Sequence, residues 1–340
     1  MKTGVGQNVT ISGTALTLNG NTINGISNLG ILVDNTSSFT LTISAPLTIG
    51  NDQAWTNNSG NLITVSGTVD TNGKALTVNG TGNTTISGVI SNSGSVTKTG
   101  SGTLTLSGAN SYTGATAVNG GTLLVSGSIA SGSAVTVSNS GTVLGGTGTI
   151  NGTVTINSGA HLLGGSGSTA SGSLTLNNNL TLNSGSIITL ALGGSFAHST
   201  LVRTGSGTWS FQSNQAFNFI DLGATTGTYD NIITGLASNP GTGSWTIQNS
   251  GWVGTFAWDG ANIDLTLTTV PEPATWLSGV LGLVGIGFMQ RRRLLRKAAL
   301  PSDPCPTIFG VICGCDGKNG TRSRPRRARH QHKWKARAPA

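Results

Sequence analysis

Apolar and polar residues alternate over short stretches along most of this chain. Between Lys98 and Gly127, Leu104 and Leu106 alternate with threonine and serine, so one side of the segment is apolar and the other carries hydroxyls. A period of two residues predicts a half-buried strand. A turn-rich segment, Gly-Ala-Asn-Ser-Tyr-Thr-Gly, then leads to a second strand at Thr122–Val125. The stretch is therefore predicted to be strand, turn and strand, with no helical period.

This unit recurs along the chain. The hexapeptide at residues 15–20 returns at 75–80, and the one at 101–106 returns in similar form at 171–176. The first offset suits three coils of roughly 20 residues each. Further strands are predicted around the pairs Leu41/Ile43, Leu62/Val65, Val135/Val137, Val154/Ile156, Leu174/Leu176 and Leu180/Leu182. Short strands at coil-like spacing favour an all-β, right-handed parallel β-helix over a sandwich of hairpins.

The segment from Ser101 to Leu123 also resembles the autotransporter-associated β-strand repeat of bacterial surface proteins, over roughly one repeat unit. The resemblance implies a repetitive, exported β-structure. We predict that such repeats build a solenoid over residues 1–200.

Composition supports a folded chain with uncharged surfaces. Glycine accounts for 53 of 340 residues and charged residues for only 8%, while 36% are hydrophobic and the mean hydropathy is +0.06. Disordered chains usually combine low hydrophobicity with high charge, so disorder is not favoured for the body. The glycines are expected at coil corners, where φ is positive. Asn19, Asn79 and Asn119 follow strands and are either stacked ladders or ordinary turn residues.

The composition changes from about Phe196. Segments with bulkier apolar residues follow, among them Trp209–Phe211 and Phe217–Phe219, and five of the seven tryptophans lie in residues 196–290. A solenoid needs an end that does not expose its stacked edge. We therefore predict an aromatic-rich β cap over residues 201–268. Its aromatic residues are expected to pack the core, with a sugar-stacking platform as the alternative.

The basic charge belongs to the C-terminal tail. Residues 1–290 carry four basic and eight acidic residues, a balance of −4, whereas residues 291–340 carry fourteen and two, a balance of +12. The body thus has no basic face for nucleic acid, and no nucleic-acid partner is expected. All three cysteines, Cys305, Cys313 and Cys315, lie in the tail. Their spacing with His330 and His332 does not fit a structural zinc site, so no metal and no cofactor are predicted.

A tripartite signal follows the predicted cap. A Pro-Glu-Pro motif contains the only glutamate of the chain, and it precedes an apolar segment and a dense arginine cluster. The apolar segment, about residues 274–290, is short for a transmembrane helix, but Trp276 at one end and the arginines at the other favour a membrane span. The motif residues are Val270, Pro271, Glu272 and Pro273, and the membrane stop begins with Arg291, Arg292 and Arg293.

Residues 269–297 resemble the PEP-CTERM sorting signal, which exosortase-type machinery recognises. The resemblance implies export, transient membrane anchoring through the C-terminus, processing near the motif, and a final place at the cell surface or outside the cell. Residues 298–340 depart from that family. They are predicted to be a disordered basic tail, while read-through or a shifted reading frame and a nucleic-acid-binding arm are the alternatives.

Catalytic patterns are sparse. The first 200 residues contain only Asp34, Asp52 and Asp70 as carboxylates, and the two body histidines, His161 and His198, are far apart in sequence. Lyase and glycosidase chemistry needs closely placed bases and carboxylates. We therefore expect no enzyme.

The sequence instead predicts an exported surface or extracellular-matrix structural rod, with extracellular polysaccharide as a candidate partner. The alternative is an adhesin or a glycan-binding protein resembling an autotransporter passenger. No signal peptide is visible at the N-terminus, where Val9 already begins a predicted strand, so the chain is suspected to begin inside the repeat array.

Overall fold

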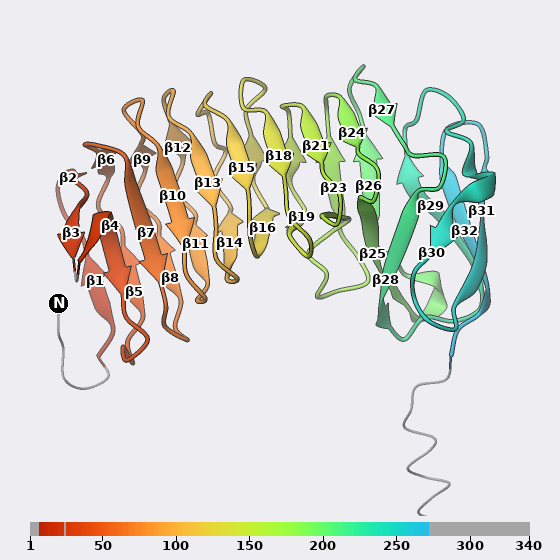
Figure 1. The fold of residues 1–340 in the computed structure, drawn as a ribbon, viewed down its shortest axis with the longest axis horizontal. Coiled ribbons are helices and arrows are strands. Elements are labelled where there is room, and N and C mark those ends of the chain that lie inside the picture. The colour runs from red at the N-terminus through yellow and green to blue at the C-terminus, as the bar shows by residue number, and fades with distance from the viewer. Residues whose placement is uncertain (1–6, 24, 272–340) are drawn as a thin grey trace, which may run out of the picture. The chain divides into compact units, whose positions relative to one another are not determined.

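The computed structural model describes residues 7–23 and 25–271, and these residues form a parallel β-solenoid of the right-handed type. Their strands stack coil upon coil in the order of the sequence (Figure 1). Apart from two 3-10 turns, η1 (Gly194–Phe196) and η2 (Thr242–Ser244), the described residues contain no helix. The predicted all-β solenoid is confirmed.

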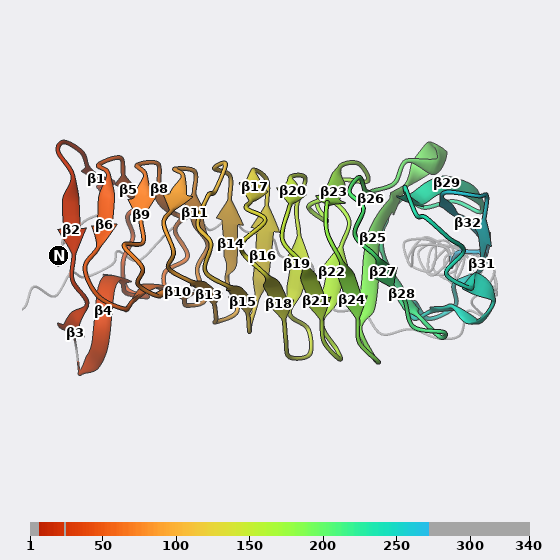
Figure 2. The same cartoon turned by 90° about the horizontal axis from the view of Figure 1, so that it is seen from above.

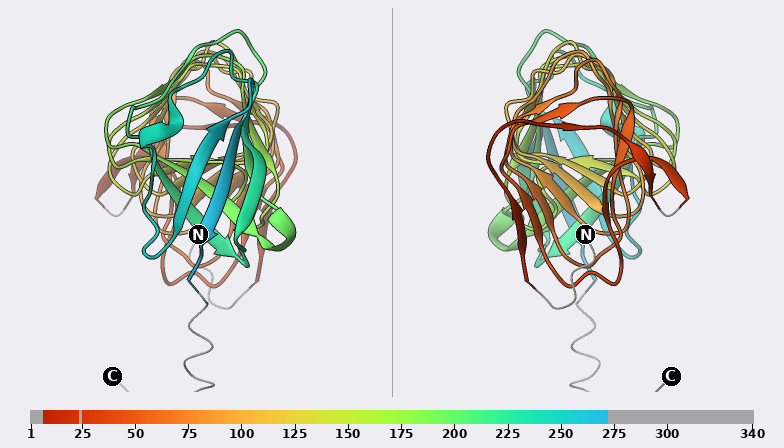
Figure 3. Two further views of the ribbon diagram at one scale, coloured as in Figure 1. Left: turned by 90° about the vertical axis from the view of Figure 1, so that its right-hand side faces the viewer. Right: turned by 90° about the vertical axis from the view of Figure 1, so that its left-hand side faces the viewer.

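Three series of strands form the walls of the coils. Figure 3 looks along the solenoid and shows the strands of each series one behind another. The first series is a parallel sheet of eleven strands, called sheet 1. Its members in spatial order are β1 (Val9–Ile11), β5 (Leu41–Ile43), β8 (Ile63–Val65), β11 (Thr84–Ile86), β14 (Thr103–Leu106), β16 (Thr122–Val125), β19 (Val143–Gly145), β22 (His161–Leu163), β25 (Ile187–Gly193), β28 (Ala216–Leu222) and β30 (Thr246–Ile247).

The second series, sheet 2, has ten strands, and its outermost strand at the C-terminal side, β27, has a single neighbour. Only its first pair, β3 with β4, is antiparallel. The strands in spatial order are β27 (Trp209–Ser210), β24 (Leu180–Leu182), β21 (Val154–Ile156), β18 (Val135–Val137), β15 (Thr116–Val118), β13 (Val96–Lys98), β10 (Leu76–Asn79), β7 (Gln53–Asn57), β4 (Ile26–Val33) and β3 (Asn21–Ile23).

The third series is divided into two sheets, which Figure 2 shows from above. Sheet 3 contains β12 (Ile90–Ser91), β9 (Val69–Asp70), β6 (Leu47–Ile49) and β2 (Leu16–Leu18). Sheet 4 contains β17 (Ser128–Ile129), β20 (Thr149–Ile150), β23 (Ser173–Leu176), β26 (Thr200–Arg203), β29 (Gly227–Thr234), β32 (Ile263–Thr269) and β31 (Val253–Trp258).

The coil length in the middle of the solenoid agrees with the period predicted from the repeats. In sheet 1, Ile63 pairs with Thr84, Thr84 with Leu104, and Leu104 with Leu123, so these coils are nearly equal in length. Later coils are longer, since Leu162 pairs with Ile188 and Ile188 with Phe217. The additional residues form the longer loops near the C-terminal end.

The two hexapeptide repeats do not mark equivalent positions in the coils, whereas the shorter repeat Ile-Ser-Gly at 11–13 and 86–88 does, since β1 and β11 both belong to sheet 1. The hexapeptide at 15–20 contains β2 in sheet 3, whereas its copy at 75–80 contains β10 in sheet 2. The copy of 101–106 at 171–176 likewise moves from sheet 1 to sheet 4. Every wall needs the same alternation of apolar and hydroxyl residues, so one short motif suits any of the three series.

The predicted alternation holds strand by strand. Leu104 and Leu106 are fully buried, while Thr103 and Thr105 are partly exposed. Five of the six further apolar pairs also point inward; the exception is Leu62/Val65, because the strand begins at Ile63 and the Leu62 side chain is 41% exposed. In the segment Leu-Ile-Thr-Val, either Leu62 or Ile63 could begin the inward alternation. The structure uses Ile63 and Val65, and a shift of one residue places Leu62 on the outer face.

Glycines serve two purposes at the corners. Gly80 and Gly100 have positive φ angles of 108° and 67°, as predicted. Others are needed because the coils approach closely: a Cβ atom at Gly88 would lie 1.9 Å from the carbonyl oxygen of Gly67. The second use could not be inferred from one coil alone, since it depends on the neighbouring coil.

The last coils differ from the rest. Strand β29 pairs parallel with β26 on one side and antiparallel with β32 on the other, and β31 and β32 form a further antiparallel pair. Phe217 lies at the centre of this region, with its ring centroid 4.4 Å from that of Phe256 and 5.1 Å from that of Trp245. The buried rings of Phe217, Trp245 and Phe256 thus pack against one another, as expected for core residues, whereas Phe211 is half-buried and Phe196 is exposed.

Candidate functional site

The predicted sorting residues fall at the limit of the described chain. Val270 is half-buried and packs against the hydrophobic core, and Pro271 is exposed. Glu272, Pro273 and the stop residues Arg291, Arg292 and Arg293 lie outside the described residues, as does the helix predicted at 274–290. Within residues 7–23 and 25–271, no helix has the length and apolar character needed to cross a membrane.

The early carboxylates act as hydrogen-bond acceptors in turns and between coils. A carboxylate oxygen of Asp52 accepts a bond of 2.8 Å from the backbone N–H of Ala75. Asp70 accepts bonds from the backbone N–H of Asn72 at 2.7 Å and from the Asn92 side-chain amide at 3.0 Å. No group of three metal-ligating side chains occurs within the described part of the chain.

The two body histidines have separate surroundings. Nδ1 of His161 lies 2.9 Å from the Thr189 hydroxyl, and burial lowers the pKa of His161. The His198 ring instead lies beside Tyr229, with 6.3 Å between ring centroids. The structure therefore does not bring the two imidazoles together with a carboxylate.

The outer surface of sheet 1 carries two rows of hydroxyl groups. Outward threonines follow each other in register from coil to coil, and a serine stands two residues after each of them. Neighbouring strands lie about 4.8 Å apart, so the threonine hydroxyls form a regular row across the sheet. The serines follow directly after the strand ends. The rows are Thr10, Thr42, Thr64, Thr85 and Thr105 with Ser12, Ser44, Ser66, Ser87 and Ser107.

The equivalent rows on sheet 2 are different. Thr136, Thr155 and Thr181 are in register there, but the residues two places later bond to one another. The Asn157 amide donates to the Ser138 hydroxyl at 2.9 Å, and the Asn183 amide donates to Asn157 Oδ1 at 2.7 Å. An amide ladder therefore exists here, but it does not include Asn19, Asn79 or Asn119, for which the sequence left ladder and turn roles open. On sheet 1, by contrast, the hydroxyl groups of the outward threonines form no hydrogen bond with any other described residue. They are therefore available to bind a ligand or water.

A buried lysine lies within the repeat unit. Lys98 is only 3% exposed and replaces an apolar residue in its row, between Val78 and Val118. Its ammonium group donates to the carbonyl oxygens of Gly100 at 2.9 Å and Gly120 at 3.2 Å. Burial lowers the pKa of Lys98 to about 8. By hydrogen bonding to both glycines, the Lys98 ammonium links the corners of two adjacent coils, which is a structural role.

Asn110 and Tyr112 occupy the break between sheets 3 and 4. The Asn110 side chain accepts a bond of 2.9 Å from the Ile90 backbone N–H and donates to the carbonyl oxygens of Gly108 and Ser128 at 2.9 and 3.0 Å. It thereby links the coil of β12 to the coil of β17. No strand of the third series lies between β12 and β17 among the described residues, and the Asn110 amide supplies part of the hydrogen bonding between these coils.

The Tyr112 ring is fully buried, and its hydroxyl lies 2.7 Å from the Thr116 hydroxyl, which in turn lies 2.8 Å from that of Ser133. Burial raises the pKa of Tyr112. The sequence predicted a turn for this segment and gave no sign of either inward side chain, because a turn segment has no alternation that could indicate them.

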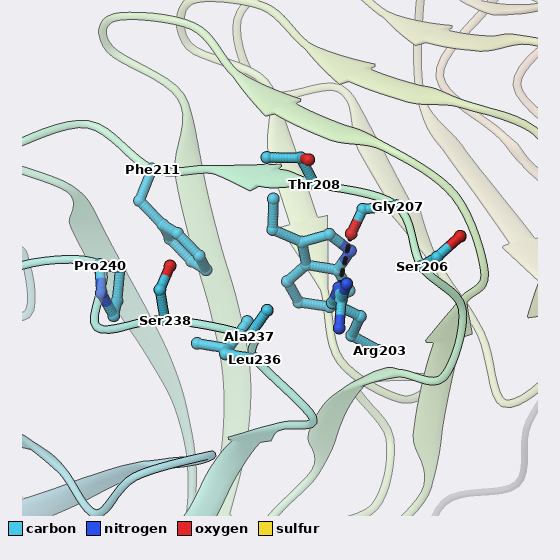
Figure 4. A pocket seen from close by; sticks show the side chains of 10 residues that line it. Arg203, Ser206, Gly207, Thr208, Phe211, Leu236, Ala237, Ser238 and Pro240 are labelled. Atoms are coloured by element: carbon cyan, nitrogen blue, oxygen red, sulfur yellow. Dashed lines mark hydrogen bonds between the residues drawn. The ribbon is translucent and has the colours of Figure 1, made fainter.

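A pocket of about 240 Å³ lies where sheet 2 ends. One wall is the segment from Arg203 to Phe211, which includes β27, and the other is the loop from Leu236 to Pro240 after β29 (Figure 4). That loop forms no strand, so the outer edge of β27 has no partner strand among the residues that the structure describes. The loop therefore stands where the next coil would supply a strand of sheet 2, and the pocket lies between the loop and the β27 segment.

The guanidinium of Arg203 is held in this pocket by backbone oxygens. Nε donates to the Gly207 carbonyl at 2.6 Å, and Nη1 donates to the Gly235 carbonyl at 2.8 Å. The side chain is partly exposed, and no carboxylate of the described residues forms an ion pair with it. Sequence patterns did not indicate this site, because its two walls come from segments that are distant along the chain.

Comparison with known protein families supports the repeat. The family described as the Passenger-associated-transport-repeat matches residues 96–125, the segment that contains Lys98, Asn110 and Tyr112. No curated protein sequence matches the chain. The family match runs from β13 to β16, somewhat more than one coil, and it agrees with the resemblance to autotransporter-associated repeats. The chain is thus a β-solenoid with one segment similar to a repeat of passenger-type proteins.

Proposed function

We propose that the protein is an exported bacterial structural rod of the cell surface or extracellular matrix, sorted by its PEP-CTERM-like signal. The observation that carries the proposal is the uncharged, register-matched wall of sheet 1. An extended solenoid with such walls supplies length and a hydrated surface. Exosortase-type machinery and the membrane are the partners that the signal implies, and processing near Pro273 releases the body.

The aromatic region supports this role as a cap. Strands β31 and β32 pair antiparallel beyond the last parallel coil, and bulky rings fill the core there. An unpaired solenoid edge would pair with other chains, and an irregular, antiparallel end discourages this. A rod that must remain separate at high local concentration benefits from such an end.

The test is surface exposure of the protein in its native host. Cells producing the full-length chain, labelled with an antibody against the body, are expected to bind the antibody without permeabilisation. The variant Glu272→Ala is expected to lose most surface labelling, and Asp264→Asn in the body is the matched control. Equal surface labelling of wild type and Glu272→Ala would reject sorting by this motif.

The adhesin alternative is favoured by a different observation, the row of free threonine hydroxyls on sheet 1. Hydroxyls donate and accept hydrogen bonds, as sugars do, and the threonine methyl groups offer apolar contact. Thr64→Lys and Thr85→Lys together are expected to abolish binding to an insoluble neutral glycan such as cellulose, if the adhesin proposal holds. Thr136→Lys with Thr155→Lys on sheet 2 is the control at equivalent positions.

A further inference from the structure

We propose that the pocket between β27 and the Leu236–Pro240 loop binds a sugar residue that carries a carboxylate, such as a uronic acid unit of an extracellular polysaccharide. The site deepens the proposed extracellular role and rests on it, because such a polymer is met outside the cell. Four features of the pocket carry the proposal: an unpaired guanidinium, its small size, an aromatic wall and a rim of hydroxyls.

The unpaired guanidinium selects the charge of the ligand. Of the five N–H groups of Arg203, two donate to backbone carbonyls and three have no hydrogen-bond acceptor among the described residues. A partly buried guanidinium usually has a carboxylate or phosphate partner, whose planar oxygens match its geometry. The carbonyls of Gly207 and Gly235 hold the group in place before a ligand arrives, which lowers the entropy lost on binding.

The size and the walls select the rest of the ligand. At about 240 Å³, the pocket is smaller than typical sites of roughly 300–1,000 Å³ and suits one ring-sized group. The half-exposed ring of Phe211 forms part of the wall, and its centroid lies 5.2 Å from that of Trp245 and 6.3 Å from that of Trp209. An aromatic ring held by two others is a rigid surface for the apolar face of a sugar.

The rim supplies polar contacts. Ser206, Thr208 and Ser238 are exposed and line the pocket (Figure 4), so their hydroxyls can bond to those of a sugar ring. A free amino acid or an acidic peptide would satisfy the guanidinium, but it would use neither the aromatic wall nor several hydroxyls at once. These features together favour an acidic sugar.

The test is calorimetric titration of purified full-length protein with a galacturonic acid trimer. The same trimer with methyl-esterified carboxyl groups is the matched ligand, because it keeps the rings and hydroxyls and loses the charge. We expect the acid to bind and the ester to bind at least about tenfold more weakly, as charged hydrogen bonds are lost. Equal binding of both, or binding of neither, would overturn the proposal, as would tighter binding of a tri-aspartate peptide.

Two variants locate the site without removing the arginine, whose loss could disturb the fold. Ser238→Trp places a bulky ring at the pocket wall and is expected to lower the affinity at least about tenfold. Asn239→Trp, at an exposed neighbouring position that does not line the pocket, is the control and is expected to bind like wild type. Unchanged affinity of Ser238→Trp would place binding elsewhere. Because the protein is purified, these results are independent of whether sorting occurs.

Discussion

The middle coils and the C-terminal coils solve the same packing problem in different ways. Between β5 and β22, the inward side chains of sheet 1 are mainly aliphatic and stack in register, and successive coils are similar in length. Beyond β25, coils lengthen, strands turn antiparallel, and aromatic rings such as Phe217 fill the core. Each middle coil packs against a similar coil on both sides, whereas the last coil of the described residues has a described neighbour on one side, and its aromatic rings fill the core there.

The largest expected effect is in the C-terminal coils. Phe217→Ala removes a fully buried ring that contacts Phe256 and Trp245, and it should lower the free energy of unfolding by about 3–5 kcal/mol. Hydrogen exchange should show lost protection mainly in β28 to β32. Leu104→Ala in the middle coils is the comparison. A loss of protection spread evenly over all coils in both variants would mean that the two regions are not distinct.

Close approach of coils in the middle region is tested by Gly88→Ala. The added Cβ would meet the Gly67 carbonyl at 1.9 Å, so the coils must separate, and we expect a loss of about 3 kcal/mol in the free energy of unfolding. Gly60→Ala, where the space is open, is the control and should change stability little. Similar stability of the two variants in chemical denaturation would show that the coils are not so tightly stacked.

The link between sheets 3 and 4 is tested by Asn110→Ala. The change leaves the Ile90 N–H without its acceptor and removes two bonds to carbonyls, so about 2 kcal/mol of stability should be lost. Asn119→Ala, an exposed position, should remain within about 0.5 kcal/mol of wild type. Equal effects in thermal or urea unfolding would contradict a specific role for the Asn110 amide.

The smallest expected effect concerns Lys98 and pH. Its pKa is about 8 in the folded protein and near the ordinary value of 10.5 when unfolded, so the unfolded chain binds more protons between these values. The lysine's contribution to stability therefore rises as pH increases from 8 to 10.5. Urea unfolding at about pH 7.5 and about pH 9.5 should show this gain in wild type relative to Lys98→Met. An identical pH response in both proteins would mean that the ammonium is well solvated.

The solenoid could be inferred from the sequence because the alternation in each strand indicates its inward face. Leu104 and Leu106 show this, and the same period of two places Lys98 inward, although charged side chains are usually exposed. Asn110 and Tyr112 could not be inferred, because the bonds that explain them come from neighbouring coils. The Arg203 pocket was missed for the same reason: its walls meet only in the folded chain.

The export proposal is tested most directly by the mass of the mature C-terminus. Protein recovered from the cell surface and medium of the native host would be digested, and its C-terminal peptide identified by mass spectrometry. We predict a terminus close to Pro273 on protein outside the cytoplasm. Protein that remains in the cytosol with an intact Ala340 terminus would contradict sorting by this signal.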